Sequence, residues 1–211
     1  MISYKIIWFF KKYHYYRCVY KPITQMNNIW KLLQSKKTVF TYQNLQSILW
    51  IQNRDTLKSF LERQIKAWIL IRPYKWIYAL QDFDIFEFAT KIKTQSYISF
   101  ETVLKKEWII FQDYWKTIFL ASDNSIEKKA FWYTFKCLKV KDNILYNPIW
   151  LINKWWYFIA TKERAICDRL YLSQNYYFDN LEWINKEKLL EISQIYSQRV
   201  FLHVKQLIEN A

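Results

Sequence analysis

The complete absence of glycine constrains this chain more than any other feature of its sequence. Glycine is the residue that tolerates positive backbone φ, which tight turns and helix ends often demand. A sequence of average composition and this length would hold about 15 glycines, whereas this chain of 211 residues has none and has 12 tryptophans. Other residues must therefore fill the turns.

Several tryptophans stand where a glycine is expected. Trp50 separates two helical patterns, and Trp68 follows a helical pattern just before a strand. Trp76 lies at the tip of an expected hairpin, and the pair Trp155 and Trp156 indicates a second turn. A bulky aromatic residue suits positive φ poorly. We hypothesise that the gene uses a genetic code in which UGA specifies glycine, so that the displayed tryptophans stand for glycines. The alternative is an unusually tryptophan-rich protein.

The remaining composition is that of a globular, soluble, cytoplasmic protein. Hydrophobic residues make up 52% and charged residues 24%, which excludes a disordered chain. No apolar run approaches the roughly 18 residues that span a bilayer, so we expect no membrane association. Cys18, Cys137 and Cys167 form no CxxC pair, and His14 and His203 are the only histidines. These residues predict neither a disulfide framework nor a metal site, and no cofactor is expected.

Residues 1–25 differ from the rest of the chain. They hold five basic residues, no acidic residue and no small-residue cleavage site, so they make a poor signal peptide. Met26 opens a more ordinary pattern, and we interpret residues 1–25 as an upstream extension from a wrongly assigned start. The alternative is a basic arm for a membrane surface or nucleic acid.

The positive charge is concentrated in residues 26–80. The formal net charge is +14, and this segment holds nine basic and two acidic residues, whereas residues 81–211 hold 18 and 16. Such a segment suits a polyanion, because lysine and arginine that neutralise phosphates release counterions. A solvated basic surface without a partner is the alternative.

The apolar pattern of residues 26–80 predicts a winged helix-turn-helix. A short helix over residues 27–35 precedes an extended piece at 38–40. Thr41 is a good N-cap for a helix over 42–49, and Asn53 for one reaching residue 67. Two short strands follow, at 69–72 and 77–80. We therefore expect an α+β protein with a winged helix-turn-helix domain over 26–80 and a mixed α/β domain over 81–211.

In this arrangement the helix after Asn53 would enter the major groove of double-stranded DNA, and the hairpin would contact the backbone or minor groove. Polar and basic residues off the apolar stripe are the expected DNA contacts. They are Asn53, Arg54, Lys58, Ser59 and Arg63 on the helix, Arg72, Tyr74 and Lys75 in the hairpin, and Thr41 and Tyr42 at the start of the preceding helix. Asp55 and Glu62 dilute the charge of this face. A winged helix that serves as a protein-interaction module is the alternative.

Residues 81–211 predict a second domain without an enzymatic site. Helices are expected over 83–93, from a Ser99 cap to 106, from a Thr161 cap to 172, and over 186–196 and 199–209. Strands are expected at 117–121, 131–140 and 157–159. Glu101, Glu163 and Asp168 are better explained as partners of helix ends or of basic residues than as catalytic groups. Cys167 is expected to be a buried thiol.

Three segments resemble the AbiEi-type antitoxins of type IV toxin–antitoxin systems, from about Met26 to beyond Leu172. AWILIRPYKWIY at 67–78 is similar to the family's G-x-L … R … G-x-Y once tryptophan is replaced by glycine. YISFETVL at 97–104 is similar to Y-[IV]-S-x-E-x-A-L, with Val103 where alanine is usual. IATKERAICD at 159–168 is similar to [IV]-A-[ST]-x-E-[KR]-A-[ILV]-x-D.

This resemblance implies a phage-defence (abortive infection) antitoxin. It would repress its own operon by binding inverted repeats in its promoter, where self-association of protomers on the DNA is expected. The neighbouring gene would encode a nucleotidyltransferase-like toxin with which the antitoxin forms no stable complex. The alternative function is a protein-interaction or nuclease-related module in which the winged helix is structural.

Overall fold

A computed structural model of the protein describes residues 23–209. The chain falls into two units, residues 1–36 and residues 37–211. The expected extension over residues 1–25 lies outside the described residues except for its last three. The domain boundary expected after residue 80 stays a prediction.

In the first unit the structure describes helix α2 (Ile23–Gln34), which includes most of the helix expected over residues 27–35. Its end is closed by Ser35, whose hydroxyl donates to the carbonyl of Leu32 at 2.6 Å. Lys36 follows with a φ of 56°.

The second unit begins with strand β1 (Val39–Thr41), helix α3 (Tyr42–Leu49) and helix α4 (Arg54–Lys66). Both expected caps are confirmed. The Thr41 hydroxyl accepts the backbone N–H of Asn44 at 3.2 Å, and the Asn44 side chain accepts the N–H of Thr41 in return. Asn53 caps α4 by accepting two backbone N–H groups. These caps satisfy donors that a helix leaves without partners at its start.

Strand β1 joins the hairpin of strands β2 (Leu70–Tyr74) and β3 (Ile77–Leu80) in a three-stranded antiparallel sheet with β3 in the middle. The pairing of β2 with β3 is irregular between Ile71 and Tyr74. Pro73 lies in this stretch, and proline has no N–H to give to a sheet, so β2 suits the edge position that it occupies.

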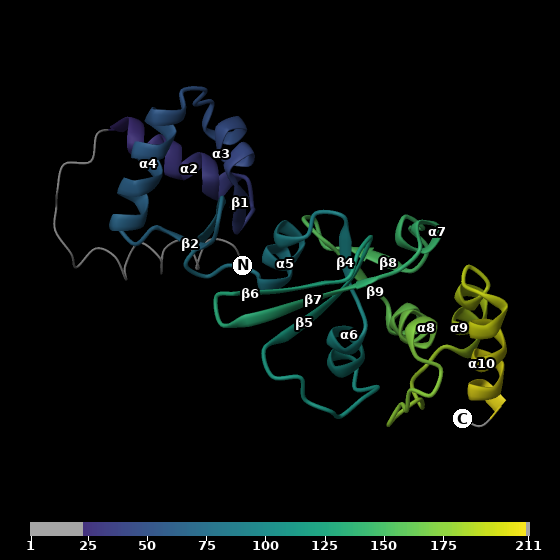
Figure 1. Ribbon diagram of the computed structural model, residues 1–211. Coiled ribbons are helices and arrows are strands. Elements are labelled where there is room, and N and C mark those ends of the chain that lie inside the picture. The colour runs from purple at the N-terminus through teal and green to yellow at the C-terminus, as the bar shows by residue number, and fades with distance from the viewer. Residues whose placement is uncertain (1–22, 210–211) are drawn as a thin grey trace. The chain divides into compact units, whose positions relative to one another are not determined.

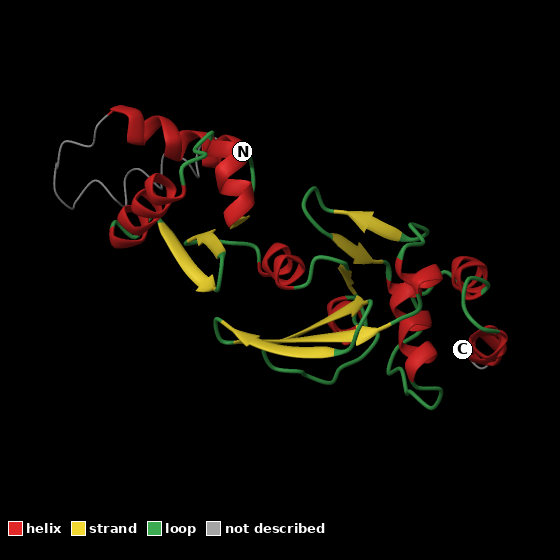
Figure 2. Cartoon of the chain, turned by 45° about the horizontal axis from the view of Figure 1, so that its top comes forward, coloured by secondary structure: helices red, strands yellow, loops and turns green. Residues whose placement is uncertain are grey.

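The rest of the second unit is built on a six-stranded mixed sheet in the order β6-β7-β5-β4-β9-β8 (Figures 1 and 2). Its strands are β4 (Ser96–Ile98), β5 (Thr117–Ser122), β6 (Ile126–Ala130), β7 (Tyr133–Lys139), β8 (Leu151–Asn153) and β9 (Phe158–Ala160). Its helices are α5 (Ile85–Ile92), α6 (Glu101–Lys106), α7 (Asp142–Leu145), α8 (Lys162–Leu172), α9 (Lys186–Ser193) and α10 (Gln198–Glu209). The protein is therefore a mixed α+β fold.

Helix α5 packs on one face of this sheet, where the ring of Phe88 meets the ring of Phe135 on β7 at 5.5 Å between centroids. Helix α6 lies on the opposite face, beside β5 (Figure 1). Helices α8, α9 and α10 pack against one another at the C-terminal end of the chain. Apolar side chains from all these elements form one continuous core.

Several sequence-based expectations for residues 81–211 were wrong. Ser99 does not cap α6: its hydroxyl donates to Asp168, and Phe100 precedes the helix without a side-chain cap. Strands β4, β6 and β8 were not expected. The strand expected at 131–140 begins only at Tyr133, because Phe131 and Trp132 form the hairpin turn with positive φ of 45° and 67°.

Positive φ is concentrated at tryptophan. Among the residues that the structure describes, eleven have positive φ, and seven of these are tryptophans: Trp50, Trp68, Trp76, Trp108, Trp132, Trp150 and Trp155. The expectation that Trp50, Trp68, Trp76 and the pair at 155–156 occupy turns with positive φ is confirmed, with Trp155 the member of the pair that adopts it.

Candidate nucleic-acid interface

The start of α3 supplies structural contacts. Besides the cap formed by Thr41, the Tyr42 hydroxyl donates to the backbone carbonyl of Arg54 at 3.4 Å. The ring of Tyr42 also meets that of Trp76 edge-on at 5.8 Å. Thr41 and Tyr42, both expected to contact DNA, therefore link α3 to α4 and to the hairpin.

The Asn53 side chain is partly occupied by hydrogen bonds within the protein. Its Oδ1 accepts the backbone N–H groups of Asp55 at 2.9 Å and Thr56 at 3.0 Å. The bidentate recognition of adenine by asparagine needs both the amide oxygen and the amide nitrogen. Because the oxygen is occupied, only Nδ2 of Asn53 is free to donate to an external acceptor.

The remaining expected contacts on α4 are all exposed: Arg54, Lys58, Ser59 and Arg63. The opposite side of the helix buries Leu57, Phe60, Leu61 and Gln64. The structure therefore brings these four polar residues to the solvent side of one helix. It places three further charged residues there, Asp55, Glu62 and Lys66. In the sequence, Asp55 and Glu62 were noted only because they lower the positive charge of this face. Lys66 was missed, although the spacing of the apolar residues places it on the exposed side of the helix.

The hairpin presents two free cationic side chains and one committed aromatic side chain. Arg72 and Lys75 are exposed. The Arg72 guanidinium lies 5.8 Å from the ring centroid of Trp76 and 5.9 Å from that of Tyr78, within the range of cation–π contacts. Tyr74 is half-buried, with the ammonium of Lys128 from β6 at 5.9 Å from its ring. Tyr74 is thus a packing residue as much as an external contact.

Another polar cluster lies in the larger sheet, around Asp168 on α8. Its carboxylate accepts hydrogen bonds from the hydroxyls of Ser99 and Tyr196, each at 2.6 Å, and from that of Tyr97 at 2.9 and 3.0 Å. Burial raises the pKa of Asp168, against the opposing effects of Arg164 and these hydroxyls. Burial also raises the pKa of Tyr97 and Tyr196, which keeps both hydroxyls protonated as donors.

Arg164 extends this cluster toward the loop after α7. Its guanidinium donates to the carbonyls of Ile144 and Asn147, both at 2.6 Å, and lies 4.7 Å from the ring centroid of Tyr97. Arg164, Asp168 and Ser99 are fully buried. Because no solvent reaches these groups, the cluster matches a role in holding β4, α8 and the loop before α10 together. The sequence marked Asp168 as a carboxylate with a structural partner and Ser99 as a helix cap, and it marked Arg164 only through the motif over 159–168.

The other carboxylates and the thiol behave as structural groups. Glu101 pairs with Arg169 at 3.3 Å, as expected for a partner of a basic residue, and Glu163 lies in the first turn of α8. Cys167 is a free, fully buried thiol whose pKa is raised by burial. Cys137 is likewise buried and free, and Cys18 lies outside the described residues.

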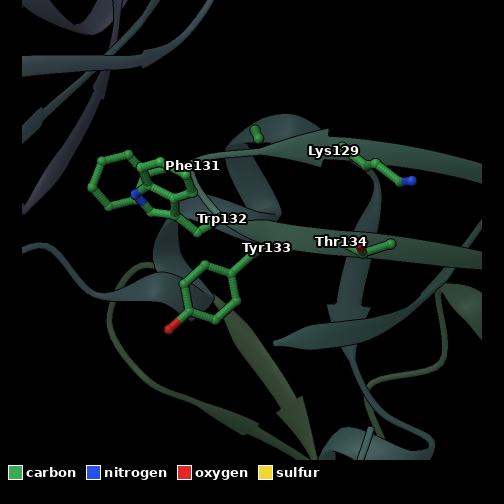
Figure 3. A pocket seen from close by; sticks show the side chains of 6 residues that line it. Lys129, Phe131, Trp132, Tyr133 and Thr134 are labelled. Atoms are coloured by element: carbon green, nitrogen blue, oxygen red, sulfur yellow. The ribbon is translucent and has the colours of Figure 1, made fainter. Parts of the chain in front are cut away.

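A shallow hollow in the surface lies at the tip of the β6–β7 hairpin. It measures about 440 Å³ and is lined by consecutive residues of one hairpin, Lys129 to Thr134 (Figure 3). Binding sites for small molecules are usually formed by groups that converge from several elements. This hollow therefore follows from the shape of the turn. Within residues 23–209, no three His, Cys, Asp or Glu side chains are grouped so as to hold a metal ion. In the same part of the chain, every helix is too short or too polar to cross a membrane.

No protein-family model and no curated protein matches the chain. Among solved structures it is similar to the RV2827C protein from Mycobacterium tuberculosis, with a TM-score of 0.53. The two chains are 9% identical, and the likeness covers 90% of this chain and 78% of the other. At that identity the similarity concerns the fold alone, and it agrees with the α+β class of the structure.

Proposed function

We propose that this protein is a DNA-binding antitoxin that represses its own operon, with residues 26–80 acting as a winged helix-turn-helix. The observation that carries the proposal is the row of exposed basic residues on α4, next in the chain to a hairpin that exposes Arg72 and Lys75. Helix α4 buries one side and leaves a polar side of suitable width for a major groove. The cations of the hairpin are suited to phosphates.

The biological setting of the proposal comes from the resemblance of residues 67–78, 97–104 and 159–168 to AbiEi-type antitoxins. Its target is double-stranded DNA with inverted repeats in the protein's own promoter, where two protomers associate. Its functional partner is a nucleotidyltransferase-like toxin, without a stable complex. We assign no catalytic step to the chain, and the central groups of the cluster around Asp168, namely Ser99, Arg164 and Asp168 itself, are fully buried.

The experiment is a fluorescence anisotropy titration of the full chain against its own upstream DNA and a scrambled duplex, each at two salt concentrations. We expect tighter and salt-dependent binding to the upstream DNA. Equal, weak binding to both duplexes by the folded protein would contradict the proposal and favour the protein-interaction module.

Variants test the proposed face. Arg54→Ala and Lys75→Ala are each expected to weaken binding and to reduce the slope of log K against log salt by about 0.9, the value of one phosphate contact. Lys106→Ala, an exposed lysine on α6, is the control that should leave the slope unchanged. Unchanged binding in both Arg54→Ala and Lys75→Ala would reject this face as the interface.

A further inference from the structure

We propose that Asp55 determines sequence specificity by accepting a hydrogen bond from the N4 amino group of a cytosine in the major groove. This inference rests on the proposed function and adds to it the base that the protein selects. It arises from the position of an acidic side chain on a surface otherwise suited to a polyanion.

The packing of α4 fixes which residues point outward. Leu57, Phe60, Leu61 and Gln64 are buried and define the inner side. With 3.6 residues per turn, the line opposite to them runs through positions 55, 59, 62 and 66. Asp55, Ser59, Glu62 and Lys66 are all exposed, as this geometry requires. The line that would face the groove floor therefore carries two carboxylates.

The first turn of α4 stabilises Asp55 in the free protein. Phosphates repel a carboxylate, so Asp55 favours DNA binding only where a hydrogen-bond donor lies opposite it. In the major groove guanine offers two acceptors, and thymine offers an acceptor and a methyl group. Adenine offers an amino donor, but next to the acceptor N7. Cytosine offers its amino group without a neighbouring acceptor, so it is the base that a carboxylate accepts best.

Two observations select Asp55 among the residues at this end of the helix. The neighbouring Asn53 has its Oδ1 occupied by two backbone N–H groups, so it cannot supply the acceptor. Among the described residues the carboxylate of Asp55 forms no hydrogen bond or ion pair, and the contact with Asn53 uses the backbone N–H of Asp55. Asp55 lies in the first turn, which leads into the groove in helix-turn-helix proteins.

Glu62 is the natural comparison within the same helix. It is exposed on the same line but lies seven residues further along, about 10.5 Å from Asp55 at 1.5 Å per residue. Lys58 and Lys66 stand four residues before and after it, which is the spacing of favourable ion pairs on a helix surface. Removing either carboxylate takes one negative charge from α4, so a general electrostatic gain is common to both changes. Loss of base preference is expected only for Asp55.

The experiment selects binding sites from a library of randomised duplexes with the full-length wild type, Asp55→Ala, Asp55→Glu and Glu62→Ala. We expect the wild type to prefer cytosine at one position of each half-site by about tenfold or more over the other bases. Asp55→Ala should lose this preference because it removes the acceptor, Asp55→Glu should keep the preference for cytosine, and Glu62→Ala should keep it while binding all duplexes more tightly.

The outcomes separate the inference from the proposed function. A wild type that selects a sequence, together with Asp55→Ala that selects the same bases equally strongly, overturns the role of Asp55 and leaves the DNA-binding function in place. A folded wild type that selects no sequence overturns both. Circular dichroism of each variant confirms the folded state, and Asp55→Glu supplies a second test at the same position.

Discussion

At the scale of single residues, the most unusual feature is the identity of the residues in left-handed turns. Trp50 ends α3 at φ 59° and ψ 32°, and it is 82% exposed. Its indole neither packs in the core nor favours this backbone conformation. The left-handed conformation costs a residue with a Cβ roughly 1–2 kcal/mol. Seven such tryptophans among the described residues fit a chain in which glycine occupied these places.

The recoding hypothesis predicts the composition of the natural protein. Peptides covering positions 50, 68 and 76 of the protein purified from its own organism should have the masses of glycine-containing peptides. Mass spectrometry of a protease digest measures this directly. Tryptophan masses at these positions would end the hypothesis.

Replacement of Trp50 by glycine in the displayed sequence should stabilise the protein. We expect Trp50→Gly to raise the free energy of unfolding by about 1 kcal/mol, because the relief of the left-handed strain exceeds the entropic cost of glycine. Trp183→Gly is the matched control, since Trp183 is 72% exposed but is not among the residues with positive φ. Urea denaturation compares the two, and an equal effect in both variants would show that exposure and not φ is responsible.

At the scale of elements, the buried carboxylate of Glu87 on α5 forms hydrogen bonds with Thr38, the residue just before β1. Oε2 of Glu87 accepts the backbone N–H of Thr38 at 2.9 Å and its hydroxyl at 2.7 Å. The Thr38 hydroxyl oxygen in turn accepts the N–H of Asp84, the cap of α5, at 2.9 Å. Glu87 is almost fully buried, and burial raises the pKa of its carboxyl above the ordinary value of 4.5, although the bonds from Thr38 oppose this.

The raised pKa gives this contact a defined pH dependence. Because the pKa of Glu87 is higher in the folded than in the unfolded protein, the folded protein binds more protons at pH values between these two pKa values. The stability contributed by Glu87 is therefore full below about pH 4.5 and declines as pH rises through the raised pKa. We expect the wild type to lose stability relative to Glu87→Gln over this interval. Urea denaturation of both proteins at a series of pH values from 4 upward measures it, and a constant difference would contradict the assignment.

Elements defined by local chemistry were predictable from the sequence, and those defined by distant partners were not. The starts of α3, α4 and α8 follow from Thr41, Asn53 and Thr161, whose side chains cap residues two or three positions ahead. Strand β4 escaped prediction because its three residues are held by β5 and β9, which are distant in the sequence. Ser99 was misassigned for the same reason, since its partner Asp168 lies 69 positions away.

In the candidate interface, too, features set by local sequence were predictable and features set by distant partners were not. The exposure of Arg54, Lys58 and Arg63 follows from the apolar period of α4, which the sequence displays. The half-burial of Tyr74 could not be foreseen, because it depends on Lys128 in a strand that the sequence did not indicate. Polarity alone therefore predicted the exposure of the residues on α4 well and that of the hairpin residues only in part.

At the scale of the whole molecule, residues 37–211 form one compact unit, and the domain boundary predicted after residue 80 lies within it. The contacts of Thr38 with Glu87 and of Tyr74 with Lys128 cross that expected boundary. If α4 reads DNA, the larger sheet is therefore attached to it by specific bonds as well as by the connecting chain.

The hydrogen-bond cluster around Asp168 also has a consequence for folding during translation. Ser99 and Tyr97 leave the ribosome before Asp168, but Tyr196 follows it by 28 residues. Until that tyrosine emerges, Oδ1 of Asp168 lacks the hydroxyl at 2.6 Å and has only that of Tyr97 at 2.9 Å. A buried carboxylate with fewer donors is less well compensated for its loss of water. The growing chain therefore completes the hydrogen bonding of this core only near the end of translation, and a message cut short before the codon for Tyr196 yields a chain whose buried carboxylate has one donor fewer.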